Sequence, residues 1–196
     1  MSISRTEPLR VAVLASGRGS NLQALIDAER DLALDIQLAG VFSDRAGSKA
    51  LERARVAGIH AEALSPRDHY DRLAFDLALF ERVEAVQPAL IVCAGYMRMI
   101  STEVVDRWSE RMINIHPSLL PAYQGLHTHE RVLRAGDRTH GASVHFVTGE
   151  LDGGPVISQV RMDVREGDSP ADLAQRLLPL EHRLLVATVA LMTRSA

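Results

Sequence analysis

Short, almost wholly apolar runs recur along the chain, separated by segments whose apolar residues follow a helical spacing. The runs suit strands buried on both faces of a parallel sheet. We predict such strands at residues 9–16, 36–44, 59–64, 88–96 and 111–116. The segments between them predict helices at residues 21–31, 48–58, 68–86 and 101–108. Gly58 should stop the second helix, and a Ser or Thr should cap the fourth.

The pattern changes after His140. Residues 142–148 and 154–164 alternate apolar and polar positions around the glycine-rich "GELDGG", which predicts two strands in antiparallel pairing. A final helix should run from about Ser169 to the end, with Pro179 as a kink. Strands alternating with helices predict an α/β fold, an open and mostly parallel sheet with an antiparallel C-terminal portion.

Length, charge and cysteine content narrow the classes of protein. A chain of 196 residues is long enough for one good core. A net charge of -3 gives no electrostatic sign of nucleic acid or anionic membrane, and no apolar run approaches a membrane span. The single Cys93 excludes an intramolecular disulfide and is expected to be a small buried hydrophobe. We therefore expect a cytoplasmic protein.

A glycine-rich segment, residues 16–21 ("SGRGSN"), joins the first predicted strand to the first helix. Glycines let the backbone approach a ligand, and a helix N-terminus offers unpaired N–H groups to an anion. No Gly-Lys-Ser/Thr follows, and Leu22 occupies the third glycine position of the dinucleotide fingerprint. The segment suits a single phosphate better than a pyrophosphate, although a tight turn without a ligand explains it about equally well.

A second candidate segment, "AGYMRMI", follows the strand that contains Cys93. Its apolar and aromatic residues suit a pocket for a flat organic ligand. Taken alone, it is explained better by ordinary core packing of Tyr96, Met97 and Met99.

Five of the eight histidines fall between positions 116 and 145. No His-Glu-x-x-His motif, second cysteine or common zinc spacing accompanies them, so we expect no metal. Asn114 and His116 are one residue apart and should share a strand face. An amide and an imidazole there suit an oxyanion stabiliser and a general acid, with Asp152 as the available carboxylate.

The chain has no Ser or Cys nucleophile motif such as G-x-S-x-G. Direct transfer between two substrates is therefore favoured over a covalent enzyme intermediate.

Three stretches resemble the family of 10-formyltetrahydrofolate-using transferases and hydrolases: "SGRGSNLQALID", "NIHPSLLPAYQGLHTH" and "HGASVHFVTGELDGGPVISQ". They extend over nearly the whole chain in the same order. Within the family, "SGRGSN" and "GLHTH" favour the glycinamide ribonucleotide formyltransferases of de novo purine synthesis. The resemblance implies direct formyl transfer from 10-formyltetrahydrofolate to the amine of glycinamide ribonucleotide, through a tetrahedral intermediate and without a metal. We expect a monomer or homodimer with no nucleic-acid or membrane partner.

The resemblance also assigns roles to residues. The implied catalytic residues are Asn114, His116 and Asp152. The residues implied to bind the ribonucleotide phosphate and ribose are Gly19, Ser20, Asn21 and Glu181. The co-substrate site is implied at Arg72, Tyr96, Met97, Arg98, Met99 and Ile100.

A single Rossmann-like domain is expected over residues 1–196, with helices on both faces of a twisted sheet. Its phosphate-binding half should cover about residues 8–100, and its catalytic and folate-binding half about residues 101–196. The chain departs from the family pattern at Arg18, where relatives often carry Asn, and at Leu178, where they have Gln or Lys.

Other functions stay open. Another 10-formyltetrahydrofolate-using formyltransferase or hydrolase is one. A nicotinamide-dependent dehydrogenase, with Asp44 as its ribose acid, is a second, and the absent third glycine counts against it. A nucleotide-binding protein without catalysis is a third, and it would leave Asn114, His116 and Asp152 without a task.

Overall fold

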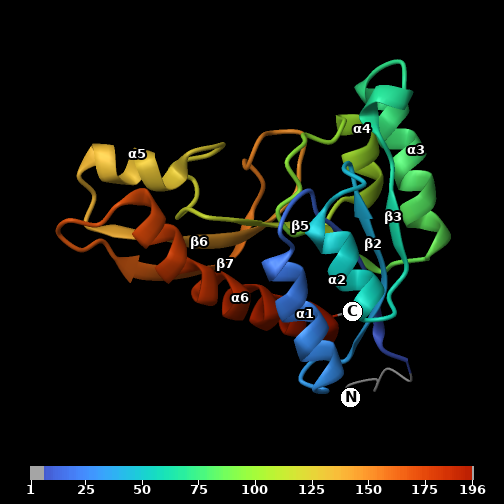
Figure 1. Ribbon diagram of the computed structural model, residues 1–196, viewed down its shortest axis with the longest axis horizontal. Coiled ribbons are helices and arrows are strands. Elements are labelled where there is room, and N and C mark those ends of the chain that lie inside the picture. The colour runs from blue at the N-terminus through green and yellow to red at the C-terminus, as the bar shows by residue number, and fades with distance from the viewer. Residues whose placement is uncertain (1–6, 196) are drawn as a thin grey trace.

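The computed structural model describes residues 7–195, and these residues form a seven-stranded sheet in the order β3-β2-β1-β4-β5-β6-β7 (Figure 1). The strands are β1 Leu9–Leu14, β2 Ile36–Ser43, β3 Ala61–Ala63, β4 Leu90–Cys93, β5 Met112–His116, β6 Thr139–Phe146 and β7 Val156–Asp163. The first five pair in parallel, whereas β6 and β7 are antiparallel to their neighbours. The predicted mixed sheet is therefore confirmed.

Within residues 7–195, five α-helices and two 3-10 turns connect the strands, and a sixth α-helix follows the last strand. The α-helices are α1 Ser20–Arg30, α2 Lys49–Val56, α3 Arg72–Ala85, α4 Thr102–Val105, α5 Thr128–Ala135 and α6 Pro170–Ser195. The 3-10 turns are η1 Pro66–Asp68 and η2 Asp106–Trp108. In Figure 1, α5 and α3 lie at opposite ends of the molecule.

Two predicted helices differ in detail from the observed ones. The helix predicted at 68–86 begins only at Arg72, because the Asp71 carboxylate caps it by accepting a hydrogen bond from the Ala74 N–H at 2.8 Å. The one predicted at 101–108 divides into α4 and η2. Helix α6 contains Pro179 within one continuous helix, as predicted, and the kink at Pro179 stays a prediction.

Helix α5 was not predicted. It is short, and it ends at Gly136, whose φ of +72° is the left-handed conformation that commonly terminates a helix.

Alternation along β1 divides the core between the two faces of the sheet. Val11 and Val13 pack with residues of α1, α2 and α6, whereas Ala12 and Leu14 pack with residues of α3. Successive side chains of a strand point to opposite faces. A strand covered on both faces must therefore be apolar throughout, which explains the unbroken "VAVL".

The three candidate site segments follow β1, β4 and β5, which are neighbours in the sheet. From β1 the chain adds β2 and β3 on one side of the sheet, and it then returns to add β4 and β5 on the other side of β1. Ligands of open α/β sheets bind beyond the carboxyl ends of the strands at such a reversal. The topology thus brings three segments that are far apart in sequence to one edge.

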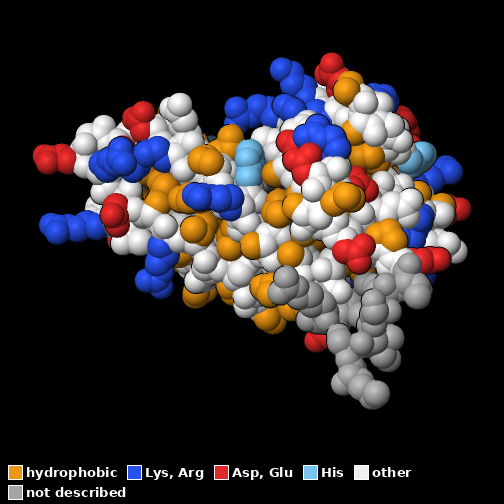
Figure 2. All heavy atoms as spheres, turned by 90° about the horizontal axis from the view of Figure 1, so that it is seen from below, with side chains coloured by type: hydrophobic (Ala, Val, Ile, Leu, Met, Phe, Trp, Pro, Cys, Tyr) orange, Lys and Arg blue, Asp and Glu red, His pale blue; other side chains and the backbone are white. Residues whose placement is uncertain are grey.

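Basic and acidic side chains are interspersed on the face shown in Figure 2, with apolar ones between them. No helix within residues 7–195 is long and apolar enough to cross a membrane.

Candidate active site

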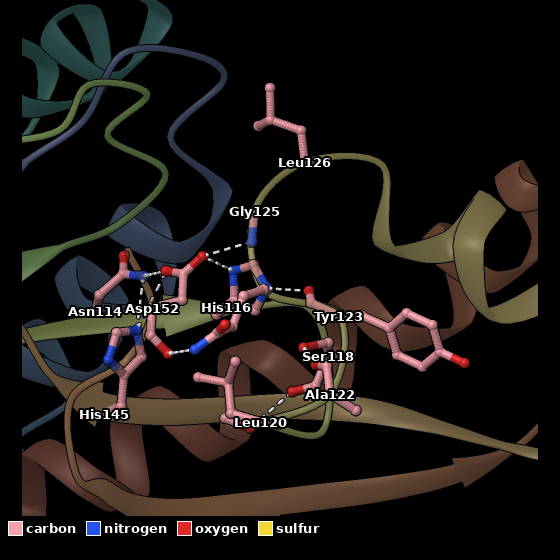
Figure 3. A network of polar contacts seen from close by, with 12 residues as sticks. Asn114, His116, Ser118, Leu120, Ala122, Tyr123, Gly125, Leu126, His145 and Asp152 are labelled. Atoms are coloured by element: carbon pink, nitrogen blue, oxygen red, sulfur yellow. Dashed lines mark hydrogen bonds and ion pairs between the residues drawn. The ribbon is translucent and has the colours of Figure 1, made fainter. Parts of the chain in front are cut away.

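Strand β5 presents Asn114 and His116 at the same side of the sheet (Figure 3). Both side chains line one cavity, and His116 is almost fully buried at 6% exposure. The neighbouring strand β6 pairs with β5 in a register that sets His145 opposite Asn114. The Asn114 Nδ2 and His145 Nε2 atoms are 3.1 Å apart.

Asp152 lies between these side chains, in the turn that joins β6 to β7 (Figure 3). One carboxylate oxygen, Oδ2, accepts a hydrogen bond from the Gly125 N–H at 2.9 Å and lies 3.4 Å from Nδ1 of His116. The other, Oδ1, lies 3.4 Å from Nδ2 of Asn114 and 3.5 Å from Nε2 of His145. One carboxylate therefore faces polar groups from three separate parts of the chain.

Both ring nitrogens of His116 face hydrogen-bond acceptors. Nε2 is 3.0 Å from the carbonyl oxygen of Tyr123, and Nδ1 faces Asp152. Burial lowers the pKa of His116 below its usual value, although the Tyr123 carbonyl and the Asp152 charge both act to raise it. The resting imidazole is therefore neutral at pH 7, with its proton best placed on Nε2. If Nδ1 also took up a proton, its N–H would donate a hydrogen bond to the Asp152 carboxylate.

Asp152 remains ionised. Burial alone would raise its pKa, but hydrogen bonds from His145 and the Gly125 N–H, with a smaller electrostatic contribution from the two neighbouring imidazole rings, lower it below the usual value. A neutral imidazole beside a carboxylate is the arrangement expected of a group that takes up a proton during a reaction.

The loop after β5 is tied to the sheet by buried hydroxyls. Ser143 of β6 donates to the Ser118 carbonyl at 2.6 Å and accepts from the Leu120 N–H at 3.0 Å. Ser118 donates to the Ala122 carbonyl at 2.6 Å. These bonds hold the loop that carries the Tyr123 carbonyl and the Gly125 N–H toward His116 and Asp152.

A cavity of about 510 Å³ opens beside this group and has the size of a site for a small organic molecule. Its lining includes a predicted set from the segment after β4, namely Tyr96, Met97, Arg98, Met99 and Ile100. Cys93 also belongs to the lining. Cys93 is buried, as predicted, and burial raises the pKa of its thiol to about 12.

The glycine-rich loop forms the N-terminal cap of α1. Gly19 has a φ of +69°, and a Cβ atom there would lie 2.7 Å from Cα of Ala50. Asn21 in the first turn donates from Nδ2 to Oε2 of Glu181 on α6 at 3.1 Å. The fold thus joins two of the residues predicted to bind the ribonucleotide, although 160 positions separate them.

One predicted site residue, and one residue that departs from the family pattern, stand apart from this arrangement. Arg72 is exposed at the start of α3 and does not belong to the described lining of the cavity. Arg18 is exposed in the glycine-rich loop, and its backbone carbonyl accepts a hydrogen bond from Nε of Arg53 at 2.9 Å. A role for Arg72 in binding the co-substrate stays a prediction.

Three groups that contact Asn114, His116 or Asp152 were not predicted from the sequence. They are the His145 imidazole, the Tyr123 carbonyl and the Gly125 N–H. The concentration of histidines between positions 116 and 145 could have drawn attention to His145. Its place beside Asn114, however, becomes known only once β5 is seen to pair with β6. The Tyr123 carbonyl and the Gly125 N–H are backbone groups, so the identity of the residue does not reveal them.

Two of the remaining histidines of this region contact each other. Nδ1 of His129 and Nε2 of His140 are 2.8 Å apart, and His129 also lines the cavity. His127 is largely exposed, with its Nδ1 3.6 Å from Oε1 of Glu130. Within residues 7–195, no group of three or more His, Cys, Asp or Glu side chains is arranged to hold a metal ion.

Comparison with known proteins agrees with this geometry. A family model described as formyl transferase matches residues 9–189. The phosphoribosylglycinamide formyltransferase of Escherichia coli is 46% identical over 90% of this chain and 83% of its own. The bovine trifunctional purine biosynthetic protein adenosine-3 is 39% identical over 95% of this chain and 18% of its own length. A crystal structure of glycinamide ribonucleotide transformylase 1 from Symbiobacterium toebii superimposes with a TM-score of 0.95 at 41% identity, covering 97% of this chain and 90% of the other.

Proposed function

This chain belongs to the formyl transferase family, and we propose that it transfers the formyl group of 10-formyltetrahydrofolate to the amine of glycinamide ribonucleotide in purine biosynthesis. The observation that carries the proposal is the convergence of an amide, an imidazole and an ionised carboxylate at one wall of the cavity. Acyl transfer without a covalent intermediate needs such groups, because its charge develops on the formyl oxygen and its protons must be moved.

The ribonucleotide half of the site is assigned to the glycine-rich loop and α6. The phosphate would accept hydrogen bonds from the N–H groups of Gly19, Ser20 and Asn21 at the N-terminus of α1. Glu181 would accept from the ribose hydroxyls. Burial raises the pKa of Glu181, and the hydrogen bond from Asn21 opposes that shift. A ribose diol would supply further donors to this carboxylate.

The formyl donor is assigned to the cavity. Its wall after β4 is largely apolar and includes Met97 and Met99, whose side chains are exposed. A flat pterin ring would cover such a surface. The formyl carbon would then lie against Asn114, His116 and Asp152, which line the same cavity.

In the reaction, the amine nitrogen bonds to the formyl carbon and the carbonyl electron pair moves onto oxygen. The Asn114 amide would donate to that oxyanion, replacing its long 3.4 Å contact with Asp152. The proton released by the amine would reach Nδ1 of His116 through water, and the resulting imidazolium would pair with Asp152. Because Nε2 already faces the Tyr123 carbonyl, the imidazolium would stabilise the oxyanion through its charge.

Collapse of the tetrahedral intermediate completes the transfer. The oxyanion reforms the carbonyl, the bond from the formyl carbon to N10 of the folate breaks, and N10 takes up the proton that the His116 imidazolium releases through water. The products are the formylated amine and tetrahydrofolate.

The test is an assay of formyl transfer with purified chain, 10-formyltetrahydrofolate and glycinamide ribonucleotide. Stoichiometric loss of the donor should require the amine substrate. Donor loss at the same rate without the amine would instead identify a hydrolase. In a parallel thermal-shift panel, both substrates should raise the unfolding midpoint and NAD should not. A rise in the midpoint with NAD and with neither substrate would instead favour the nicotinamide-dependent dehydrogenase.

A further inference from the structure

The wall of the cavity after β4, residues 95–101, has no regular secondary structure. Six of its residues, Gly95 to Ile100, line the cavity. The backbone of such a segment lacks the hydrogen bonds of a sheet or a helix. Its conformation therefore depends on the other groups that bind its N–H and C=O groups. Two buried side chains from other parts of the chain hold this one.

The first anchor is Ser16, which is 2% exposed. Its hydroxyl oxygen accepts a hydrogen bond from the Met97 N–H at 2.9 Å, and its own N–H donates to the Gly95 carbonyl at 3.0 Å. Ser16 also begins the glycine-rich loop, whose Gly17 carbonyl accepts from the Ser48 hydroxyl at 3.1 Å. One residue therefore connects the cavity wall to the loop assigned to phosphate.

The second anchor is Asp76, which is fully buried in the middle of α3. Its Oδ2 accepts two short hydrogen bonds from Ser101, from the N–H at 2.7 Å and from the hydroxyl at 2.6 Å. Ser101 occupies the N-cap position of α4, but its hydroxyl makes no cap hydrogen bond. The predicted cap is therefore wrong in its chemistry, because the hydroxyl is directed to Asp76 instead.

The wall also rests on the same turn of α3 between these two ends. The guanidinium carbon of Arg98 lies 5.2 Å from the centre of the Phe75 ring, next to Asp76 in sequence. Ser16 and Asp76 themselves lie outside the described lining of the cavity. Their contacts reach a ligand only through the backbone of the wall.

We propose that Ser16 and Asp76 are positioning residues that hold the cavity wall in the shape required by the formyl donor. This inference rests on the function proposed above. Charge-assisted hydrogen bonds to a buried carboxylate are among the stronger ones in proteins, and a small displacement of a binding wall weakens the contacts along it.

The geometry separates a positioning role for Asp76 from a role that needs its charge. Oδ2 makes both bonds to Ser101, whereas Oδ1 has no hydrogen-bond partner within the described part of the chain. An Asn side chain at this position can therefore keep its amide oxygen toward Ser101 and place its NH₂ group on the unpartnered side. Asp76→Asn should preserve the anchor, and Asp76→Ala should remove it.

The kinetic experiment compares Ser16→Ala, Asp76→Ala and Asp76→Asn. The first two should raise the KM for 10-formyltetrahydrofolate roughly tenfold, since each leaves a wall N–H without its buried partner. Asp76→Asn should stay within about threefold of the wild type on the same reasoning. Neither Asp76 variant should change the KM for the ribonucleotide.

The matched control is Ser43→Ala. Ser43 is also fully buried, and its hydroxyl also accepts from a backbone N–H, that of Arg45 at 3.1 Å, but it does not contact the wall. The donor KM should not change in this variant. Equal increases in the control and the anchor variants, or equal increases in both substrates' KM values for Asp76→Ala, would mean general destabilisation and overturn the inference.

Amide hydrogen exchange measured by NMR tests whether the hydrogen bonds of Ser16 and Asp76 to the wall are lost, and it does not depend on turnover. Exchange of the Met97 N–H should accelerate in Ser16→Ala, and exchange of the Ser101 N–H should accelerate in Asp76→Ala. Faster exchange with an unchanged donor KM would disprove the positioning role. Absence of formyl transfer by the wild type would instead refute the proposed function and leave the exchange result standing. If Asp76→Ala does not fold, Ser16→Ala against Ser43→Ala still decides the matter.

Discussion

At the scale of single residues, Asp152 organises the candidate site. Its two carboxylate oxygens face the His116 ring, the Gly125 N–H, the Asn114 amide and the His145 ring, all within 3.5 Å. Its backbone φ of +49° is left-handed, which is uncommon for a residue other than glycine. Strain of this kind persists where the surrounding contacts fix the residue.

Replacing Asp152 with Asn should lower turnover sharply at neutral pH and leave the affinities for both substrates nearly unchanged. The change keeps the volume but removes the charge that raises the pKa of His116, so that pKa should fall further. A pH–rate profile of both enzymes, with direct binding of each substrate, provides the measurement. Glu166→Gln, an exposed acid of another loop, is the control. Near-normal turnover in Asp152→Asn would remove this residue from the mechanism.

Truncating Asn114 to Ala should cost a hundred- to a thousandfold in kcat, about 3–4 kcal/mol of transition-state stabilisation, if its amide donates to the oxyanion. The KM values should change little, because the lost interaction belongs to the transition state. Single-turnover kinetics at saturating substrates measures the step directly. A loss below about tenfold would be too small for an oxyanion donor.

At the scale of elements, the glycine-rich loop is fitted between α1 and α2. The Gly17 carbonyl accepts from the Ala50 N–H at 3.1 Å, and Gly19 lies against the same alanine. The first turn of α1 is also joined to α6 by the bond from Asn21 to Glu181. Helices α2 and α6 therefore both contact the end of α1 that would receive a phosphate.

Gly19→Ala should weaken ribonucleotide binding and leave donor binding nearly intact. The added Cβ would lie 2.7 Å from Cα of Ala50, and the φ of +69° is unfavourable for alanine, so the loop must shift. Titration calorimetry with each substrate measures the effect. Gly17→Ala is a matched control, because a Cβ there meets nothing within 4 Å and its φ is not positive. Equal weakening of both substrates would make the loop purely structural.

At the scale of the whole molecule, buried histidines link the fold to pH. Burial lowers the pKa of His116, His129, His140 and His182, in the case of His140 to about 4. Between the ordinary histidine pKa and these lowered values, the unfolded chain binds more protons than the folded one. Stability must then fall as the pH falls from about 6.5. Glu181, whose pKa is raised, acts in the opposite direction but is a single group.

The urea midpoint should accordingly be lower at pH 5 than at pH 7.5, with the folded state intact at both. His140→Asn should reduce this difference, because the replacement binds no proton in either state. His127→Gln, at an exposed position, is the control and should leave the difference unchanged. A midpoint independent of pH, or a difference that persists in His140→Asn, would contradict the assignment.

The sequence by itself determined the elements of the sheet and the two residues that share a strand face. Unbroken apolar runs fix buried strands, and a two-residue period places Asn114 and His116 on one side, since both signals are local. Glycines at left-handed positions fixed the end of α2 at Gly58 in the same way.

The tertiary structure alone decided how these parts meet. The approach of Asp152 to His116, the pairing that sets His145 opposite Asn114, and the direction of the Ser101 hydroxyl toward Asp76 all depend on long-range contacts. The Tyr123 carbonyl and the Gly125 N–H are backbone groups, which every residue type could supply. Such contacts are fixed when strands pair in one register and loops close over them, and local residue preferences carry no information about either event.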